Sequence, residues 1–422
     1  MQNKKKRILV ISSADPLKGP GLLALDMYKS LLEAGADVDL LTKNPVEGHP
    51  EVLFVEEKSS ILEKIRIKIR ARFLKQEKGY FFFYKKETNP PISSKKVLAK
   101  ITKPYDMVCV LFWQDMLSFK TINDIYEKLK CRIVFRCVDY SPMSGGCHFT
   151  GSCERYQIGC GACPAIGSTD ENDYTAWNVK YRKQVYDHVK PIVFGNSYMQ
   201  KFYNKSFLLK DVRKVLSWPI IDVDSFKPLD ASSLRKKYGI ADHTRFIIFF
   251  GCQSLTDPRK GMNLLVESLK IFADQLTEEQ RNGVLLMAAG RDFSALAPLL
   301  PFESRDFGYV NSSVLPDLYS MADVFVCPSV NDAGPMMVNQ SLCCGTPVVG
   351  FEMGACLQAV KDHGTGYCAQ LNDVVDLASG IRWVYGLSQS ERRELSAHCR
   401  EFAVLHHSYR AFSDQLLSFV DD

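Results

Sequence analysis

DVFVCPSVNDAGPMMVNQSLCCGTPVVGF, residues 323–351, has the pattern of a strand, a polar loop, a helix and a second, buried strand. Pro335 would open the helix, where its missing N–H leaves no hydrogen bond unmade. The free amides of that first turn, from Gly334 through Pro335 and Met336 to Met337, would attract an anion because a helix N-terminus carries partial positive charge. We therefore expect a phosphate group there, although an ordinary strand-to-helix turn has the same pattern.

The alternation of apolar runs with amphipathic stretches continues on both sides of this segment. RILVIS (7–12) and DVDLLT (37–42) flank a helical stretch that ends at Gly35, and RFIIFFG (245–251) restarts the series. Such alternation predicts parallel sheets with crossover helices. We expect an α/β protein of two Rossmann-like domains facing a central crevice, where the carboxyl ends of both sheets would meet a ligand.

The expected domain boundaries follow the composition. The predicted parts are an N-terminal Rossmann-like domain over 1–200 with a Cys-rich insert at 145–164, a linker over 201–230, a C-terminal Rossmann-like domain over 231–402, and a final helix over 403–422 that packs towards the N-terminal domain.

Composition excludes several classes of protein. The chain has 422 residues, of which 46% are hydrophobic and 24% charged, as in a globular protein of two or three domains. A net charge of +5 does not indicate a nucleic-acid-binding protein. The apolar run after MQNKKKR is too short for a secretory signal and no window approaches a transmembrane span, so we expect a cytoplasmic protein. Most of its 14 cysteines lie in apolar segments, which favours reduced, buried thiols.

A basic pair lies upstream of the opening segment. FFGCQSLTDPRKGMNLLVESL (249–269) places Arg259 and Lys260 in a loop between a strand and a helix. Two cations near a helix N-terminus could neutralise a leaving diphosphate without a metal, while a solvated surface pair is the plainer alternative.

Linked motifs connect these parts to a known family. LYSMADVFVCPS (318–329), CGTPVV (344–349) and AAGRDF (288–293) resemble the nucleotide-binding half of retaining glycosyltransferases of family four, which have the GT-B fold. The resemblance implies that Lys260 contacts the donor diphosphate, with Arg259 beside it, and that catalysis requires no metal.

The family carries two glutamates separated by seven intervening residues, one near the transferred sugar and one at the nucleotide ribose. The matching positions here are Asp332 and Gln340. Asp332 is one methylene shorter than glutamate, and Gln340 could still bind a ribose hydroxyl through its amide. The resemblance therefore makes Asp332 a catalytic candidate and Gln340 a donor-binding candidate.

The resemblance makes the N-terminal domain (1–200) the acceptor domain and the C-terminal domain (231–402) the nucleotide-sugar donor domain. Two further segments belong to the acceptor domain. Gly21 lies in a glycine-containing loop after the first strand, where turn geometry explains it equally well, and its position matches the loop that similar enzymes place beside the donor phosphates. DYSPMSGGCHFTGSCERYQIGCGACP (139–164) resembles a Cys-rich segment of family-four enzymes that build bacterial surface polysaccharides. A histidine usually precedes the aspartate in that subset, but Val138 stands here, so Asp139 remains as the acceptor-binding and catalytic candidate.

The spacing C-x5-C-x6-C-x2-C in this segment could hold a structural zinc ion. Four thiolates from Cys147, Cys153, Cys160 and Cys163 would complete a tetrahedral site with no open position for catalysis. Reduced thiols that pack a loop, or a disulfide, are the alternatives.

The stretch Ser60–Tyr84 is basic and aromatic. Ser60 and Glu63 form a capping-box pattern, and Lys64, Lys68, Arg72 and Lys75 would share one helical face. This face is either solvated on its own domain or bound to an anionic membrane surface, which would make the protein peripheral on the inner face of the cell membrane.

We therefore expect a retaining glycosyltransferase that moves a sugar from a nucleotide-sugar to a glycan or lipid-linked glycan. The resemblance implies a place in surface polysaccharide synthesis. A catalytically weakened relative that binds nucleotide-sugars or serves as a scaffold is the alternative. A nicotinamide-dependent dehydrogenase is disfavoured because no G-x-G-x-x-G follows the first strand and no acid ends the second.

Overall fold

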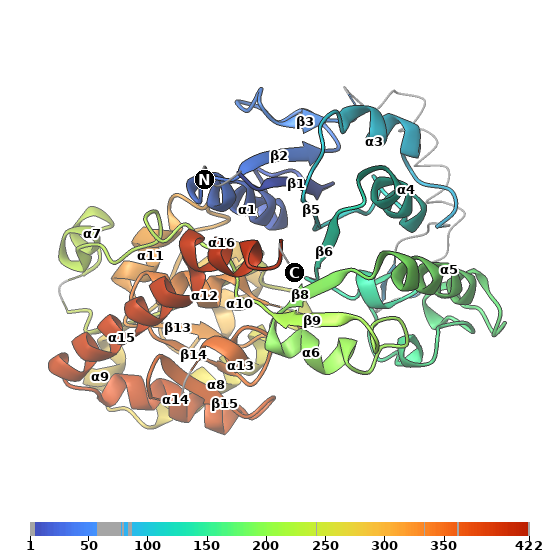
Figure 1. Ribbon diagram of the computed structural model, residues 1–422. Helices are drawn as coiled ribbons and strands as arrows, with labels where there is room; N and C mark the ends of the chain where they lie inside the picture. Colours follow the sequence, from blue (N-terminus) through green and yellow to red (C-terminus); the bar gives the residue numbers. More distant parts are fainter. Residues whose placement is uncertain are drawn as a thin grey trace. The chain divides into compact units, whose positions relative to one another are not determined.

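The computed structural model describes residues 5–56, 77, 80–82, 87–241, 243–332, 334–360 and 363–420. The chain divides into two α/β units (Figure 1). Unit 1 comprises Met1–Gly195, Met199–Ile220 and Phe412–Asp422, and unit 2 comprises Asn196–Tyr198 and Ile221–Ala411.

Unit 1 contains a seven-stranded parallel sheet in the order β3-β2-β1-β5-β6-β8-β9. The strands are β1 (Arg7–Ser12), β2 (Asp37–Thr42), β3 (Leu53–Phe54), β5 (Met107–Val110), β6 (Arg132–Arg136), β8 (Ile192–Gly195) and β9 (Arg213–Leu216). The strand order reverses between β1 and β5. In open parallel α/β sheets, ligands bind at the carboxyl edge beside such a reversal.

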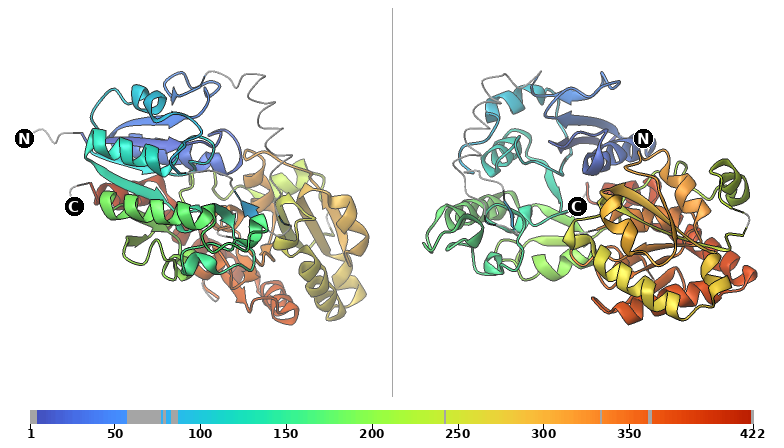
Figure 2. Two further views of the ribbon diagram at one scale, coloured as in Figure 1. Left: turned by 90° about the vertical axis from the view of Figure 1, so that its right-hand side faces the viewer. Right: turned by 180° about the vertical axis from the view of Figure 1, so that it is seen from behind.

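The helices of unit 1 flank this sheet (Figure 2). They are α1 (Leu22–Glu33), α3 (Ser94–Lys100), α4 (Phe119–Leu129) and α5 (Tyr174–Val189), with α16 (Tyr409–Leu417) from the end of the chain and α6 (Ser197–Tyr203), whose first residues are assigned to unit 2. A buried aromatic cluster of Trp113, Phe119, Phe135 and Tyr186 joins α4 and α5 to the sheet. A short antiparallel pair, β4 (Phe81–Phe82) and β7 (Cys147–Phe149), lies outside the sheet.

Unit 2 repeats the same topology with six parallel strands in the order β12-β11-β10-β13-β14-β15. The strands are β10 (Phe246–Ser254), β11 (Val284–Arg291), β12 (Glu303–Asp306), β13 (Val324–Cys327), β14 (Val348–Phe351) and β15 (Gly366–Ala369). The helices are α7 (Ala231–Lys237), α8 (Met262–Asp274), α9 (Glu278–Asn282), α10 (Phe293–Leu296), α11 (Leu315–Met321), α12 (Met336–Cys343), α13 (Cys356–Ala359), α14 (Val374–Gly386) and α15 (Gln389–His407). The reversal here lies between β10 and β13, so the loops after these strands hold the expected ligand site.

The expected linker over 201–230 differs from the structure. Residues up to Ile220 belong to unit 1, because β9 adds a seventh strand beside β8. The β9 sequence, RKVL, has no apolar alternation since it forms a partly exposed edge, which is why its pattern does not reveal a strand.

The C-terminal residues Phe412–Asp422 are assigned to unit 1. Phe419 packs edge-on against Phe194 with 5.3 Å between ring centroids, and the guanidinium of Arg136 lies 5.7 Å from the centre of the Phe412 ring. The Gln415 side chain donates a 2.8 Å hydrogen bond to the Leu216 carbonyl. The end of the chain therefore covers β6, β8 and β9.

Within the described residues, no helix has the length and apolar character that crossing a bilayer requires. Most of the basic stretch Ser60–Tyr84, including its predicted capping box and cationic face, lies outside the described residues.

Candidate donor and acceptor sites

Unit 2 carries the predicted donor residues on the two loops at its strand-order reversal. The loop after β10 contains a short 3-10 turn, Pro258–Lys260, and the loop after β13 runs from Pro328 to Pro335, just before α12. The carbonyl of Arg259 accepts a 2.9 Å hydrogen bond from the Val330 amide, which joins the two loops. Residues far apart in the sequence thus form one edge of unit 2.

The structure brings Lys260 and Asp332 together as an ion pair. Their side chains are 20% and 18% exposed, so the pair is screened only in part. Burial lowers the pKa of Lys260, but the charge and hydrogen bond of Asp332 outweigh burial and raise that pKa above its ordinary value. The other oxygen of Asp332 accepts a 3.0 Å hydrogen bond from the Gly334 amide. Both carboxylate oxygens therefore have partners within unit 2.

Two glycines permit this arrangement. Gly261 has φ +65°, and a β-carbon on it would lie 2.0 Å from the Pro328 carbonyl oxygen. Gly354 has φ +53°, and a β-carbon there would lie 2.7 Å from the Asp332 carbonyl oxygen. Neither position can accept a side chain unless the loops separate.

Arg259 has a partner of its own. Asp257 accepts hydrogen bonds from the Arg259 amide at 3.0 Å and from its guanidinium at 2.7 Å. Burial raises the pKa of Asp257, but the hydrogen bonds from Arg259 lower it more, so the net pKa is below the ordinary value. The Arg259 side chain is 42% exposed, and its charge lies at the surface of the loop.

The first turns of α12 carry the remaining donor candidates. Pro335 is the N-cap and Met336 the first helical residue, close to the predicted start. The absence of a side chain on Gly251 makes room for Met337, whose methyl group lies 3.0 Å from where a β-carbon would be. Gln340 accepts a 3.3 Å hydrogen bond from the hydroxyl of buried Tyr319, which fixes its amide.

A third segment of unit 2, Asn196–Tyr198, contacts the residues around Gly334 and Gln358. Sequence reasoning missed this segment. The Ser197 amide donates a 3.1 Å hydrogen bond to Gln358, and a β-carbon on Gly334 would lie 3.0 Å from the Asn196 side-chain nitrogen. Burial, and then the nearby charge of Asp332, raise the pKa of Tyr198. The sequence holds no signal for this contact, because Asn196–Tyr198 follows a strand of unit 1.

In unit 1, Gly21 caps the start of α1. A β-carbon on it would lie 1.9 Å from the Asp15 carbonyl oxygen, so the loop itself requires glycine at this position. The backbone packing is a sufficient reason for this glycine, independent of any donor contact.

Asp139 follows β6 at the carboxyl edge of the sheet and is 2% exposed. One of its oxygens accepts a 2.6 Å hydrogen bond from the Ser141 amide, and the other lies 2.6 Å from Nδ1 of His148. The His148 side chain is 23% exposed. The side chain of His148 is therefore more accessible than that of Asp139. Sequence reasoning did not pair the two residues, because spacing along the chain does not reveal the contact.

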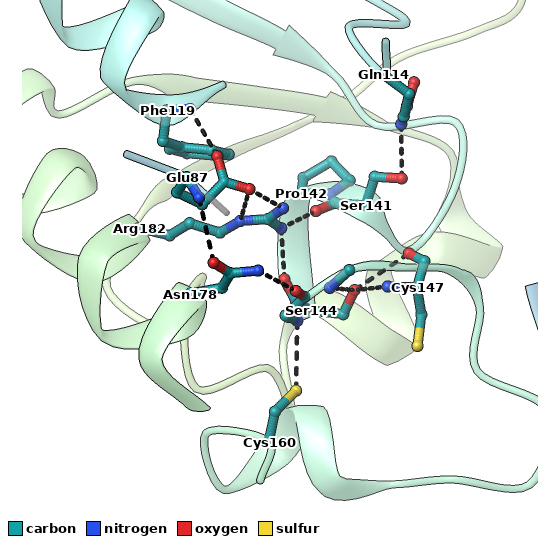
Figure 3. Close-up of polar contacts among 12 residues, drawn as sticks. Glu87, Gln114, Phe119, Ser141, Pro142, Ser144, Cys147, Cys160, Asn178 and Arg182 are labelled. Carbon is teal, nitrogen blue, oxygen red and sulfur yellow. Dashed lines mark hydrogen bonds and ion pairs between the residues drawn. The ribbon is translucent and has the colours of Figure 1, made fainter. Parts of the chain in front are cut away.

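The segment that carries Asp139 and His148 is held by a buried ion pair (Figure 3). The Arg182 guanidinium contacts Glu87 at 2.6 Å and donates to the carbonyls of Ser141, at 2.5 Å, and Ser144. The second oxygen of Glu87 accepts a 2.7 Å hydrogen bond from the Phe119 amide at the start of α4. Glu87 and Arg182 are 0% and 3% exposed, so this network is a buried anchor for the loop.

The four cysteines of the predicted zinc site line one cavity in unit 1. All four are free thiols. Among the residues that the structure describes, no group of three or more His, Cys, Asp or Glu side chains already stands in a metal-binding arrangement.

Comparison with protein-family models finds a match in unit 2. Residues 230–403 match the family model "Glycosyl transferases group 1". The match covers less than half of the chain and coincides with most of unit 2, including Lys260, Asp332 and Gln340.

Curated relatives match over a similar length. The chain is 30% identical over 196 residues to a D-inositol 3-phosphate glycosyltransferase of Geodermatophilus obscurus, covering 44% of this chain and 42% of the relative. It is 28% identical over 205 residues to the putative glycosyltransferase YtcC of Bacillus subtilis, covering 44% of this chain and 48% of the relative. The chain thus spans about half the length of the curated relatives that it matches.

Solved structures match over the whole chain. A sucrose-phosphate synthase from Thermosynechococcus elongatus has a TM-score of 0.67 at 17% identity, covering 99% of this chain and 98% of that one. HepE from Anabaena, in complex with UDP and glucose, has a TM-score of 0.62 at 14% identity, covering 99% of each chain. The fold predicted from the sequence, GT-B with two Rossmann-like domains, is confirmed.

Proposed function

We propose that this protein is a glycosyltransferase that uses a nucleotide-sugar donor. The observation that carries the proposal is the position of Lys260 beside the N-terminus of α12, at the strand-order reversal of a unit that matches the glycosyl transferase group 1 family. A cation and free helix amides at this place suit a diphosphate. HepE, which shares the fold, binds UDP and UDP-glucose, which supports the same ligand class here.

In the proposed mechanism, the donor diphosphate takes over the ammonium of Lys260 from Asp332. The cation then stabilises the charge that grows on the leaving nucleoside diphosphate, with no metal required. Asp332, released from Lys260, lies beside the sugar, and Gln340, oriented by Tyr319, binds the ribose. We propose that the transfer retains the configuration of the sugar.

On the acceptor side, we assign the contact to His148. Asp139 holds Nδ1 of the ring, so Nε2 is the nitrogen that would orient the acceptor hydroxyl. We propose a glycan or lipid-linked glycan as the acceptor, in surface polysaccharide synthesis, with the basic stretch Ser60–Tyr84 meeting an anionic membrane. Failure of the protein to float with vesicles of anionic lipid would remove the membrane part of this proposal.

The direct test measures nucleotide binding, donor hydrolysis and sugar transfer separately, with UDP-, GDP- and ADP-sugars. Lys260→Ala should weaken diphosphate binding by tenfold or more, on the order of 1.4 kcal/mol. Lys270→Ala, which removes an exposed lysine of α8 in the same unit, serves as the matched control and should change nothing.

A second candidate function is nucleotide-sugar binding without efficient turnover. Its supporting observation is that Asp332 already neutralises Lys260, so donor binding must break an internal ion pair. Binding with no hydrolysis or transfer for any of the three donor classes would favour this candidate.

A further inference from the structure

The short loop after β14, residues 352–355, lies beside the loop that carries Asp332. β13 and β14 are neighbouring parallel strands with Cys327 opposite Gly350, so the segments that leave their carboxyl ends run next to each other. A β-carbon on Gly350 would lie 2.8 Å from the Cys327 carbonyl oxygen, so the glycine permits this close approach. The two loops therefore meet within unit 2.

Met353 contacts the backbone of Asp332. The Asp332 amide donates a 3.1 Å hydrogen bond to the sulfur of Met353, which is buried, with 1% of the residue exposed. Gly354, the next residue of the loop, packs against the carbonyl of Asp332. The amide and the carbonyl of Asp332 thus meet two consecutive residues of the loop after β14.

The backbone of Met353 is itself held by hydrogen bonds. Its amide donates to the Phe351 carbonyl at 2.6 Å, and its carbonyl accepts a 3.0 Å hydrogen bond from the Cys356 amide at the start of α13. Just before it, the Glu352 amide donates to the Ala369 carbonyl of β15 at 2.7 Å. The sulfur of Met353 is therefore presented to Asp332 from a hydrogen-bonded turn at the edge of the sheet.

Asp332 has two sets of contacts, and donor binding affects them differently. Its carboxylate pairs with Lys260 and accepts a hydrogen bond from the Gly334 amide. Its backbone contacts Met353 and Gly354. In the proposed function, the donor diphosphate takes Lys260 away from the carboxylate. Because the backbone contacts do not involve Lys260, they persist and hold Asp332 in place after its ion pair is broken.

The sulfur of Met353 contributes a hydrogen bond in addition to packing. A thioether is a weak acceptor, but a buried amide without any acceptor is costly. Leucine has nearly the volume of methionine and no acceptor atom, so Met353→Leu would fill the same space and leave the Asp332 amide unpaired. This substitution therefore separates the hydrogen bond from the packing.

We propose that Met353 is a positioning residue, whose sulfur holds the backbone of Asp332 so that the carboxylate stays beside the transferred sugar after Lys260 has passed to the donor. The inference rests on the proposed transferase function. Its consequence is a division of effects. Loss of the sulfur should lower turnover without weakening nucleotide binding, because a less firmly held Asp332 competes less well with the diphosphate for Lys260.

Hydrogen exchange tests the contact itself, on the whole protein and without a donor. The Asp332 amide should be protected in the wild type, and Met353→Leu should speed its exchange by about fivefold, the equivalent of one net hydrogen bond. Met287→Leu, which changes a buried methionine of β11 in the same unit, is the matched control and should leave this exchange unchanged. An unprotected Asp332 amide in the wild type, or equal rates in the wild type and Met353→Leu, would overturn the proposal.

Kinetics test the role of the contact, with the UDP-, GDP- or ADP-sugar that the wild type uses. Met353→Leu should lower kcat by about tenfold, because a small displacement of a group at the reacting centre is costly. The Kd of the nucleoside diphosphate should stay the same or fall. Weaker nucleotide binding together with lower kcat would show general damage to the unit, and unchanged kcat would show that Asp332 does not need the sulfur, so either result contradicts the proposal.

The two experiments separate this inference from the proposed function. If the wild type transferred no sugar from any of the three donors, the transferase proposal would fail. The exchange measurement needs no donor, so it would still decide whether Met353 holds the backbone of Asp332.

Discussion

The ammonium of Lys260 is paired with the carboxylate of Asp332, 72 residues further along the chain. The family resemblance assigns the two residues to different parts of the donor, Lys260 to the diphosphate and Asp332 to the sugar. An anionic donor therefore competes with a carboxylate of the protein for the same cation. Asp332→Asn should tighten binding of the preferred nucleoside diphosphate by roughly fivefold, since a partly exposed pair contributes about 1 kcal/mol. The same variant should lower turnover.

Isothermal titration and a transfer assay on the same preparation of this variant provide the check. Weaker nucleotide binding by Asp332→Asn would mean that the carboxylate positions Lys260 for the donor rather than competing with it.

Gly261 should not accept a side chain. Gly261→Ala places a methyl group against the Pro328 carbonyl and forces a left-handed backbone on alanine, which should cost roughly 1–3 kcal/mol and weaken nucleotide binding. Gly386→Ala is the matched control, because Gly386 ends α14 with open space around it and ordinary φ. Urea unfolding should show a lower free energy of unfolding for Gly261→Ala and an unchanged one for Gly386→Ala. Equal stability of the two would show that the loops after β10 and β13 can separate freely.

The buried pair of Glu87 and Arg182 gives a prediction about stability. Arg182→Met leaves the Glu87 carboxylate buried without its partner and should cost about 3–5 kcal/mol. The double variant Glu87→Gln/Arg182→Met buries no charge and should cost at least about 1 kcal/mol less than the sum of the two single variants. Denaturant unfolding of the three variants forms a double-mutant cycle, and strict additivity would contradict the network drawn in Figure 3.

The lowered pKa of Asp257 predicts that the stability of the protein depends on pH. Its pKa in the folded protein is below the ordinary 3.8, so its ionised carboxylate contributes stability above pH 3.8 that is lost as the pH falls through the folded pKa. The free energy of unfolding of the wild type should exceed that of Asp257→Asn at pH 7, and the difference should shrink below pH 3.8. If the difference in the free energy of unfolding between the wild type and Asp257→Asn grew on acidification, the ionised carboxylate of Asp257 would not stabilise the folded protein.

The proposed acceptor site gives His148 and Asp139 different roles: His148 contacts the acceptor, and Asp139 holds the histidine ring. His148→Ala should raise the KM for the acceptor or lower kcat while the Kd for the nucleotide is unchanged, and His148→Gln, which keeps a hydrogen-bond acceptor, should recover part of the loss. Unaltered transfer by His148→Ala would remove the histidine from the acceptor site, whereas no transfer by the wild type would remove the transferase proposal itself.

The central strands could be predicted because they are buried on both faces and therefore read as continuous apolar runs. RILVIS forms β1 over the predicted residues, and the apolar part of RFIIFFG forms the start of β10. Edge strands gave no such signal. ESRD, which forms β12, and RKVL, which forms β9, are polar because one side of each strand meets solvent.

The loops that carry Lys260 and Asp332 could be located from the sequence, but the contacts between them could not. The pairing of Lys260 with Asp332, and of Glu87 with Arg182 across 95 residues, depends on which loops the topology brings together. The link from His148 to Asp139 depends on β7 folding back beside the turn that follows β6. Spacing along the chain carries no information about such distances.

Apart from the short segment Asn196–Tyr198, the assignment of Phe412–Asp422 to unit 1 means that the main chain enters unit 2 near Ile220 and leaves it near Ala411. A single proteolytic cut at either passage leaves the two units covalently joined through the other. Release of Ile221–Ala411 as a separate fragment therefore requires both cuts. A shortened C-terminus would uncover apolar surface on β6, β8 and β9 of unit 1, although the residues that precede the cut in the chain belong to unit 2.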